Sequence, residues 1–263
     1  MVHAKKSFGQ HFLKSPRVVS AIIESAEIKK GETVVEVGPG TGVLTRALVT
    51  AGARVIAIEA DRDLIPVLEA EFGDAIELIE GDALHFDFTL HPLLSTTYPL
   101  PPTPYTLCSN LPYNVGTEIL ERFLTSTHPP RRCVVMVQKE VGDRMMALPG
   151  DMSLLSLAVQ IYADVQRVVR VPPGAFSPPP KVDSVVIRLD KNQKAVDPES
   201  VIALAKTGFH ARRKQLHRNL ADAGIAKSET VKEWLVSQGL KETARAQELS
   251  VENWIALYTC LNF

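Results

Sequence analysis

The sequence predicts an α/β fold built on a parallel sheet, followed by a small all-α domain. Short runs rich in Val and Ile alternate with stretches of helical apolar spacing through the first 190 residues. These runs show little alternation of polar and apolar residues, which is typical of strands buried on both faces. No comparable run follows residue 197, so the remainder of the chain is expected to be helical.

The individual elements follow from this pattern. The runs expected to form parallel strands span residues 33–37, 54–58, 76–79, 105–109 and 134–137. Two more runs, 165–171 and 185–189, are separated only by the Pro-rich segment 172–180. Because this segment is too short for a crossover helix, we expect an antiparallel pair that closes the sheet. The first helix is expected to begin at Ser15-Pro16, since Ser caps helices and Pro suits the first helical position.

Two domains are expected, at residues 1–190 and 197–263. Asp197-Pro198 indicates a newly capped helix just after the last predicted strand. A Pro-rich insert at residues 91–104 is predicted to be a surface loop, because Pro fits neither a strand ladder nor a helix interior.

Composition excludes several classes of protein. The chain is 45% hydrophobic and 22% charged, which argues against a disordered, collagen-like or disulfide-framework protein. Its net charge of −1 gives no global sign of a nucleic-acid partner. No apolar run approaches the ~18 residues of a membrane span, and the first residues lack the apolar segment of a secretory signal. Three scattered Cys indicate a reduced, cytoplasmic protein, and the His spacing predicts no metal site.

A glycine loop follows the first predicted strand. Gly38, Gly40 and Gly42 lie at a strand-to-helix turn, where glycine lets the backbone approach a ligand closely. Val43 occupies the third glycine position of the dinucleotide fingerprint, so that motif fails. A tight structural turn is the alternative explanation for the glycines.

Two acidic residues at strand ends complete the expected ligand site. Glu59 comes about 20 residues past Gly38, where a carboxylate can accept both ribose hydroxyls of an adenosine. Asp82, after the third strand, can accept from an adenine amino group. The glycine loop has no Lys or Arg to meet a pyrophosphate. S-adenosylmethionine therefore fits better than NAD or ATP.

The fourth strand runs into Asn110-Leu111-Pro112-Tyr113. An exocyclic adenine amine is a poor nucleophile, and a site that accepts hydrogen bonds from both of its N–H groups favours a pyramidal nitrogen. The Asn110 side-chain oxygen and the Leu111 carbonyl are the candidate acceptors, acting through positioning and electrostatics. Tyr113 and Phe176 are expected to stack on the two faces of the target base, each worth about 1–3 kcal/mol. Core packing is the alternative for Phe176.

These motifs together resemble the small-subunit ribosomal RNA adenine N6,N6-dimethyltransferases over nearly the whole chain. The resembling segments are Phe8-Gly9-Gln10-His11-Phe12-Leu13, Val35-Glu36-Val37-Gly38-Pro39-Gly40-Thr41-Gly42-Val43-Leu44-Thr45, Glu59, Gly81-Asp82-Ala83, Asn110-Leu111-Pro112-Tyr113-Asn114 and Phe176-Ser177-Pro178-Pro179-Pro180-Lys181-Val182-Asp183-Ser184. The resemblance implies a Rossmann-like S-adenosylmethionine-dependent methyltransferase domain with a small all-α C-terminal domain.

The resemblance also implies residue roles. His11 and Leu13 would cover the cofactor, Gly38 would lie beside its methionine part, and Gly40 would also bind it. Glu59 would take the ribose. Asp82 with Ala83 would take the adenine, and Asn110 would sit between methyl donor and target amine. One departure is that the family usually has Asn where this chain has His11.

A basic segment is the candidate RNA contact. Between residues 206 and 218 no acidic residue occurs. The cations Arg212, Arg213, Lys214 and Arg218 form a local patch inside a nearly neutral protein, and His210 and His217 add to it. Arg131-Arg132 is expected to extend the track. A plain solvated helix face is the alternative.

The function expected from the resemblance is dimethylation of two adjacent adenosines in the 3′-terminal hairpin of 16S rRNA, within the small ribosomal subunit or its precursor. The protein would act as a cytoplasmic monomer with a role in subunit biogenesis. Three alternatives stay open at this point: a 23S rRNA adenine dimethyltransferase that confers macrolide resistance, a ribosome-assembly factor that needs no catalysis, and a small-molecule methyltransferase.

Overall fold

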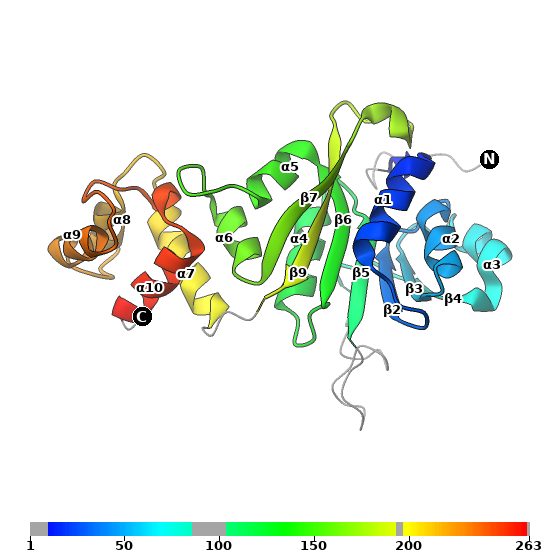
Figure 1. Ribbon diagram of the computed structural model, residues 1–263, viewed down its shortest axis with the longest axis horizontal. Coiled ribbons are helices and arrows are strands. Elements are labelled where there is room, and N and C mark those ends of the chain that lie inside the picture. Colours follow the sequence, from blue (N-terminus) through cyan, green and yellow to red (C-terminus); the bar gives the residue numbers. More distant parts are fainter. Residues whose placement is uncertain (1–9, 86–103, 193–196, 262–263) are drawn as a thin grey trace, which may run out of the picture. The chain divides into compact units, whose positions relative to one another are not determined.

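The structure is a computed structural model that describes residues 10–85, 104–192 and 197–261. Contacts divide the chain into two compact units (Figure 1). Unit 1 comprises residues 1–142 and 165–191, and unit 2 comprises residues 143–164 and 192–263. Unit 2 thus takes in the segment 143–164, which the sequence analysis assigned to the first domain. The predicted loop at 91–104 lies almost wholly outside the described residues.

Unit 1 is built on a seven-stranded sheet of order β4-β3-β2-β5-β6-β9-β7. Its strands are β2 (Thr33–Val37), β3 (Arg54–Glu59), β4 (Ile76–Glu80), β5 (Tyr105–Asn110), β6 (Arg132–Gln138), β7 (Ala163–Val171) and β9 (Ser184–Lys191). The first five run parallel, and β9 is antiparallel to β6. All seven predicted strands are present. The two edge strands, β4 and β7, depart from the expected burial, because each has only one neighbour in the sheet and is partly exposed.

Helices accompany the sheet. The α-helices described between residues 16 and 145 are α1 (Pro16–Ala26), α2 (Val43–Thr50), α3 (Ile65–Phe72), α4 (Gly116–Thr125) and α5 (Lys139–Met145). In Figure 1, α1 lies in front of the sheet and α4 behind it. Helix α1 begins at Pro16, as predicted, and buries Val18, Val19 and Ile22 against the strands. Burying such side chains contributes roughly 1.5–3 kcal/mol each.

A second, two-stranded sheet joins distant parts of unit 1. Strand β1 (Phe12–Leu13) pairs antiparallel with β8 (Phe176–Ser177), so Leu13 faces Phe176 in the register. Both of these side chains are buried in the core that α1 and α2 share with the large sheet. The segment before α1 is therefore held against the segment that precedes β9.

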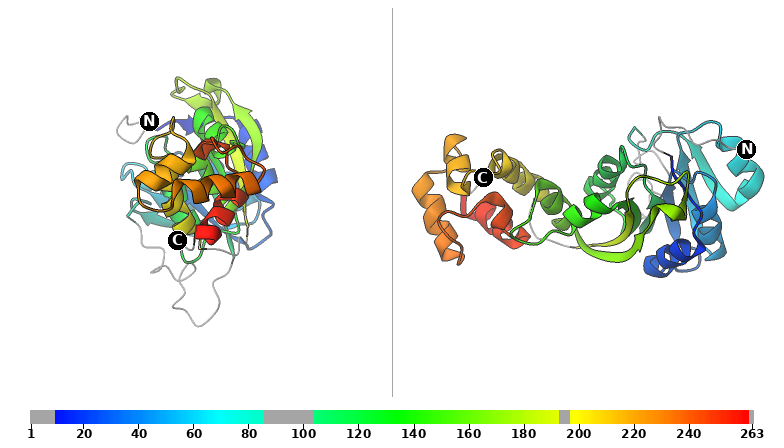
Figure 2. Two further views of the ribbon diagram at one scale, coloured as in Figure 1. Left: turned by 90° about the vertical axis from the view of Figure 1, so that its left-hand side faces the viewer. Right: turned by 90° about the horizontal axis from the view of Figure 1, so that it is seen from above.

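Unit 2 is helical, and its helices surround a core of their own (α6 in green, the others yellow to red in Figure 2). They are α6 (Leu154–Gln160), α7 (Pro198–Phe209), α8 (Leu216–Asp222), α9 (Ser228–Ser237) and α10 (Val251–Leu261). Asp197 caps α7 as predicted, accepting from the backbone N–H of Glu199 at 3.1 Å. Gly208 allows close packing, because a Cβ there would lie 2.4 Å from the fully buried ring of Trp254.

Candidate active site

A pocket of about 280 Å³ opens at the carboxyl ends of the parallel strands. This is the edge at which open α/β sheets bind ligands. The turns after β2, β3, β4 and β5 all contribute to its wall. The predicted site residues that line it are His11, Gly38, Gly40, Glu59, Asp82, Ala83, Asn110, Leu111, Pro112 and Tyr113.

The glycine loop forms one wall of the pocket. Gly38, Gly40 and Gly42 all have positive φ, between 60° and 74°, a conformation that favours glycine. A Cβ on Gly38 would meet no atom within 4 Å, so this face of the loop is open. The loop is tied to the neighbouring strand, because the Gly38 N–H donates to the Ile58 carbonyl at 2.9 Å.

Glu59 stands at the end of β3 and is 5% exposed. One carboxylate oxygen accepts from the Gly40 N–H at 3.1 Å and the other from the Asp61 N–H at 2.9 Å. Burial raises the pKa of Glu59, with the Asp61 carboxylate adding to the effect and the backbone donors opposing it. Asp61 is itself buried and accepts from the Gln10 amide at 2.8 Å. Asp61 was not among the site residues predicted from the sequence.

Asp82 and Ala83 lie in the turn after β4. One Asp82 oxygen accepts from the Leu84 N–H at 2.9 Å, and the other lies 3.1 Å from His85 Nδ1. The Asp82 side chain is half exposed, whereas Ala83 is buried. This turn therefore presents a carboxylate and a small apolar surface to the same pocket.

Asn110 is the last residue of β5, and its side chain is oriented by a hydrogen bond to the residue that precedes β1. Its amide Nδ2 donates to the His11 carbonyl at 3.0 Å. This bond distinguishes the two ends of the amide and assigns Oδ1 as the remaining acceptor. The adjacent Leu111 N–H donates to the Met136 carbonyl of β6 at 3.2 Å, which fixes the backbone at the start of the turn.

Tyr113 is half buried in the pocket wall. Its ring centroid lies 5.3 Å from that of His11, and its hydroxyl is hydrogen-bonded to Ser184 Oγ. His11 Nδ1 lies 2.8 Å from the Pro178 carbonyl oxygen. Since a carbonyl only accepts, Nδ1 carries the proton. His11 thus uses its ring to contact the Pro-rich turn as well as Tyr113.

Two predicted site residues lie elsewhere. Leu13 and Phe176 are 5% and 1% exposed, belong to the hydrophobic core and are not among the lining residues. Their backbones pair in the small β1–β8 sheet, which turns both side chains inward. Stacking of Phe176 on a base stays a prediction, and it would require this sheet to open.

The basic segment lies in unit 2, at the turn between α7 and α8 and the start of α8. Arg212, Arg213, Lys214 and Arg218 are exposed, and Lys214 pairs with Asp222 at 3.0 Å. His217 does not join this surface. It is 6% exposed and bonded to Ser228 and Gln215, and burial lowers its pKa.

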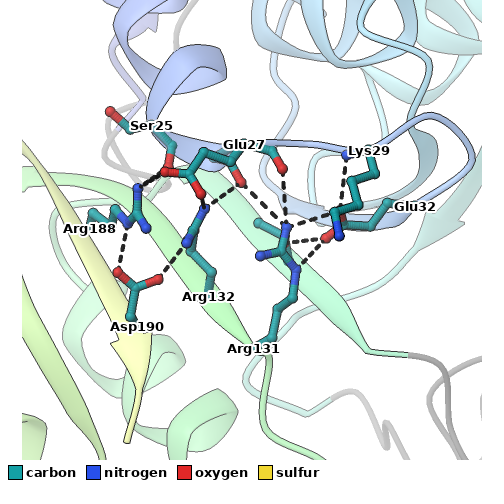
Figure 3. A network of polar contacts seen from close by, with 10 residues as sticks. Ser25, Glu27, Lys29, Glu32, Arg131, Arg132, Arg188 and Asp190 are labelled. Carbon is teal, nitrogen blue, oxygen red and sulfur yellow. Dashed lines mark hydrogen bonds and ion pairs between the residues drawn. The ribbon is translucent and has the colours of Figure 1, made fainter.

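Arg131 and Arg132 do not extend the basic track. Arg131 pairs with Glu32 at 2.7 Å, and Arg132 pairs with Asp190 at 2.6 Å and with Glu27 at 2.8 Å (Figure 3). Arg132 is 7% exposed. Both cations are therefore engaged in ion pairs, which lie at the end of the sheet where the parallel strands begin.

The pocket suits a cationic adenosine derivative. Its described lining holds two carboxylates, from Glu59 and Asp82, and neither Lys nor Arg. Phosphates would meet no countercharge there, whereas a sulfonium would. Among the residues that the structure describes, no cluster of three His, Cys, Asp or Glu side chains could hold a metal ion. Within the same residues no helix is long and apolar enough to cross a membrane.

Fold and pocket together define a methyltransferase that uses S-adenosylmethionine. Residues 1–262 match the family model described as ribosomal RNA adenine dimethylase. The chain belongs to this family, and it is an rRNA adenine dimethyltransferase.

Curated relatives agree along nearly the whole chain. The chain is 41% identical to the ribosomal RNA small subunit methyltransferase A of Thermosynechococcus vestitus, over 98% of this chain and 96% of that protein. It is 42% identical to the protein of the same name from Phenylobacterium zucineum, over 97% of this chain and 87% of that one.

Solved structures show the same fold. A dimethyladenosine transferase from Plasmodium falciparum superimposes with a TM-score of 0.76 at 24% identity, over 96% of this chain and 99% of that one. The 23S rRNA methyltransferase ErmE gives a TM-score of 0.75 at 23% identity, over 96% and 100% of the two chains. These likenesses cover both the sheet domain and the helical tail.

Proposed function

We propose that this protein transfers methyl groups from S-adenosylmethionine to N6 of two adjacent adenosines in the 3′-terminal hairpin of 16S rRNA, dimethylating both. The observation that supports this most is the oriented Asn110 amide in the wall of a pocket suited to a cationic adenosine. The names of the curated relatives favour the small subunit over 23S rRNA as the substrate.

The cofactor would be held by the residues that meet at the strand ends. Glu59 offers its carboxylate to the ribose, and Asp82 with Ala83 faces the adenine. The open face of Gly38 leaves room for the methionine part. When bound, S-adenosylmethionine supplies an electrophilic methyl group on a positively charged sulfur.

Asn110 and Leu111 would position the target amine. Asn110 Oδ1 and the Leu111 carbonyl are two acceptors for the two N6 protons, and neither is a base of useful strength. Their contribution is therefore orientation and electrostatic stabilisation of the developing charge on nitrogen. Tyr113 offers a stacking surface that offsets part of the cost of unstacking the base.

The exposed cations of unit 2 would contact rRNA phosphates. Phosphate contacts supply most of the affinity of such complexes, and Arg212 and Arg213 are exposed for them. A monomeric state and a cytoplasmic location stay predictions.

The test is tritiated methyl transfer, in separate reactions, to 30S subunits isolated from a strain that lacks adenine dimethylation and to unmethylated 23S rRNA, followed by mass mapping of the modified nucleotides. We expect dimethyladenosine at two adjacent positions of the 3′ hairpin. Label in 23S rRNA would instead assign the protein to the macrolide-resistance group. Label on neither RNA would contradict the proposal.

Asn110→Ala separates catalysis from an assembly role. Because the variant loses the Oδ1 acceptor, we expect methyl transfer to fall by at least 100-fold. The same variant is expressed in cells that lack the enzyme, and subunit profiles are compared with those given by the wild-type protein. Normal subunit assembly with the inactive variant would favour an assembly role that does not depend on catalysis. Full methyl transfer by the variant would contradict the role proposed for Asn110.

A further inference from the structure

Two residues between Phe176 and the start of β9, Pro178 and Ser184, contact the side chains of the pocket wall. Ser184 is the first residue of β9 and is fully buried. Its backbone is fixed opposite Gln138 in the ladder between β9 and β6. From this position its hydroxyl bonds the hydroxyl of Tyr113, 71 residues earlier in the chain.

The same segment holds Tyr113 from a second side. The Pro178 carbonyl accepts from His11 Nδ1, and the His11 ring lies against Tyr113 with an interplanar angle of 33°. Tyr113 is thus contacted at its hydroxyl by Ser184 and beside its ring by His11. A swing of the Tyr113 side chain about its Cα–Cβ bond would break the first contact and disturb the second.

We propose that Ser184 is a positioning residue for the methyl-transfer reaction, which fixes where the Tyr113 ring lies against the target adenine. The proposal rests on the proposed function, since only a base substrate makes the position of this ring matter. Ser184 itself is fully buried and is not among the residues that line the pocket, so it acts through Tyr113 alone. A misplacement of about 1 Å at a reacting group is enough to cost 10²-fold in rate.

The test is a double-mutant cycle of Ser184→Ala and Tyr113→Phe, assayed by methyl transfer to unmethylated 30S subunits. Each change removes one partner of the same hydrogen bond and keeps the rest of the side chain. We expect each single variant to lower kcat about 10-fold and the double variant to lower it no further. The affinity for S-adenosylmethionine, measured by calorimetry, is expected to stay within twofold of wild type.

Thr106→Val is the matched control. Thr106 is a fully buried hydroxyl in β5, bonded to Glu32 at 2.7 Å near the start of the strand that ends in Asn110. The Thr106→Val substitution removes a buried hydroxyl from the same sheet at a position that does not line the pocket, so kcat should stay within twofold of wild type. Thermal melts of all four variants show whether each is folded.

Three results would overturn the proposal. The first is wild-type kcat in Ser184→Ala. The second is additive losses in the double variant, since Ser184 would then act on something other than Tyr113. The third is a loss confined to KM for S-adenosylmethionine.

Failure of the proposed function has a different signature, because the wild-type protein itself would then methylate no adenosine. If Ser184→Ala does not fold, wild-type kcat in Tyr113→Phe overturns the proposal.

Discussion

Glu36 is a buried carboxylic acid in β2, two residues before Gly38 of the glycine loop. It is 2% exposed, and its Oε2 finds no hydrogen-bond partner among the described residues. Burial raises the pKa of Glu36 from 4.5 to about 8, with the Glu59 carboxylate adding to the effect. The folded protein therefore keeps this proton over a range of pH in which the unfolded chain has lost it.

This raised pKa makes the free energy of unfolding depend on pH. Between these two pKa values the folded state binds more protons, so the free energy of unfolding falls as pH rises, by up to about 1.4 kcal/mol per pH unit. Glu36→Gln keeps the shape and removes the titration, and we expect its unfolding free energy to change less between pH 6 and pH 8. Urea denaturation of both proteins at the two pH values measures this, and parallel curves would contradict it.

Most residues of the site could be predicted because each belongs to a strand end, and strand ends meet at one edge of a parallel sheet. Gly38, Glu59, Asp82 and Asn110 all follow this rule. Phe176 was predicted at the pocket because its ring could stack on the second face of the target base, whereas the β1–β8 pairing turns its side chain into the core. The contact of Ser184 with Tyr113 could not be predicted, because it depends on the register between β6 and β9 rather than on local sequence.

At the scale of elements, an ion network joins helix α1 to the sheet. Arg132 Nη1 donates to the Ala26 carbonyl at the last residue of α1 and pairs with Glu27 just beyond it. Arg188 also bonds Glu27, and Asp190 bonds both arginines (Figure 3). The two arginines hold the pKa of Glu27 at about 2. Apart from Arg188 and Asp190, which are neighbours along β9, the paired residues lie more than 50 positions apart in the chain, so no local sequence motif indicates the network.

Arg132→Ala is expected to lower the free energy of unfolding by about 2 kcal/mol, because the buried Ala26 carbonyl loses this donor while Asp190 and Glu27 keep only Arg188. Arg46→Ala is the control, since it removes an exposed ion pair with Glu71, and such pairs contribute about 1 kcal/mol or less. Chemical denaturation of the two variants compares them directly. Equal losses would show that the network adds nothing beyond surface pairing.

For the molecule as a whole, charge is balanced and attraction to RNA must be local. With 29 basic and 30 acidic residues, the chain has no long-range field that favours a polyanion. The cations Arg131 and Arg132, which the sequence suggested for RNA, are engaged in ion pairs within unit 1. Arg212 and Arg213 in unit 2 are exposed and are therefore the stronger candidates for phosphate contacts.

Arg212→Ala/Arg213→Ala should then raise KM for 30S subunits while kcat stays within twofold of wild type. Each lost phosphate contact lowers the slope of log KM against log salt by about 0.7–1, so the slope should fall by about 1.4–2 between 50 and 200 mM salt. Lys227→Ala/Lys241→Ala removes the same charge from exposed positions of the same unit and serves as the control. An equal change in slope for the two double variants would mean that total charge, not this turn, attracts the RNA. A change confined to Arg212 and Arg213 would locate the contact at the turn between α7 and α8.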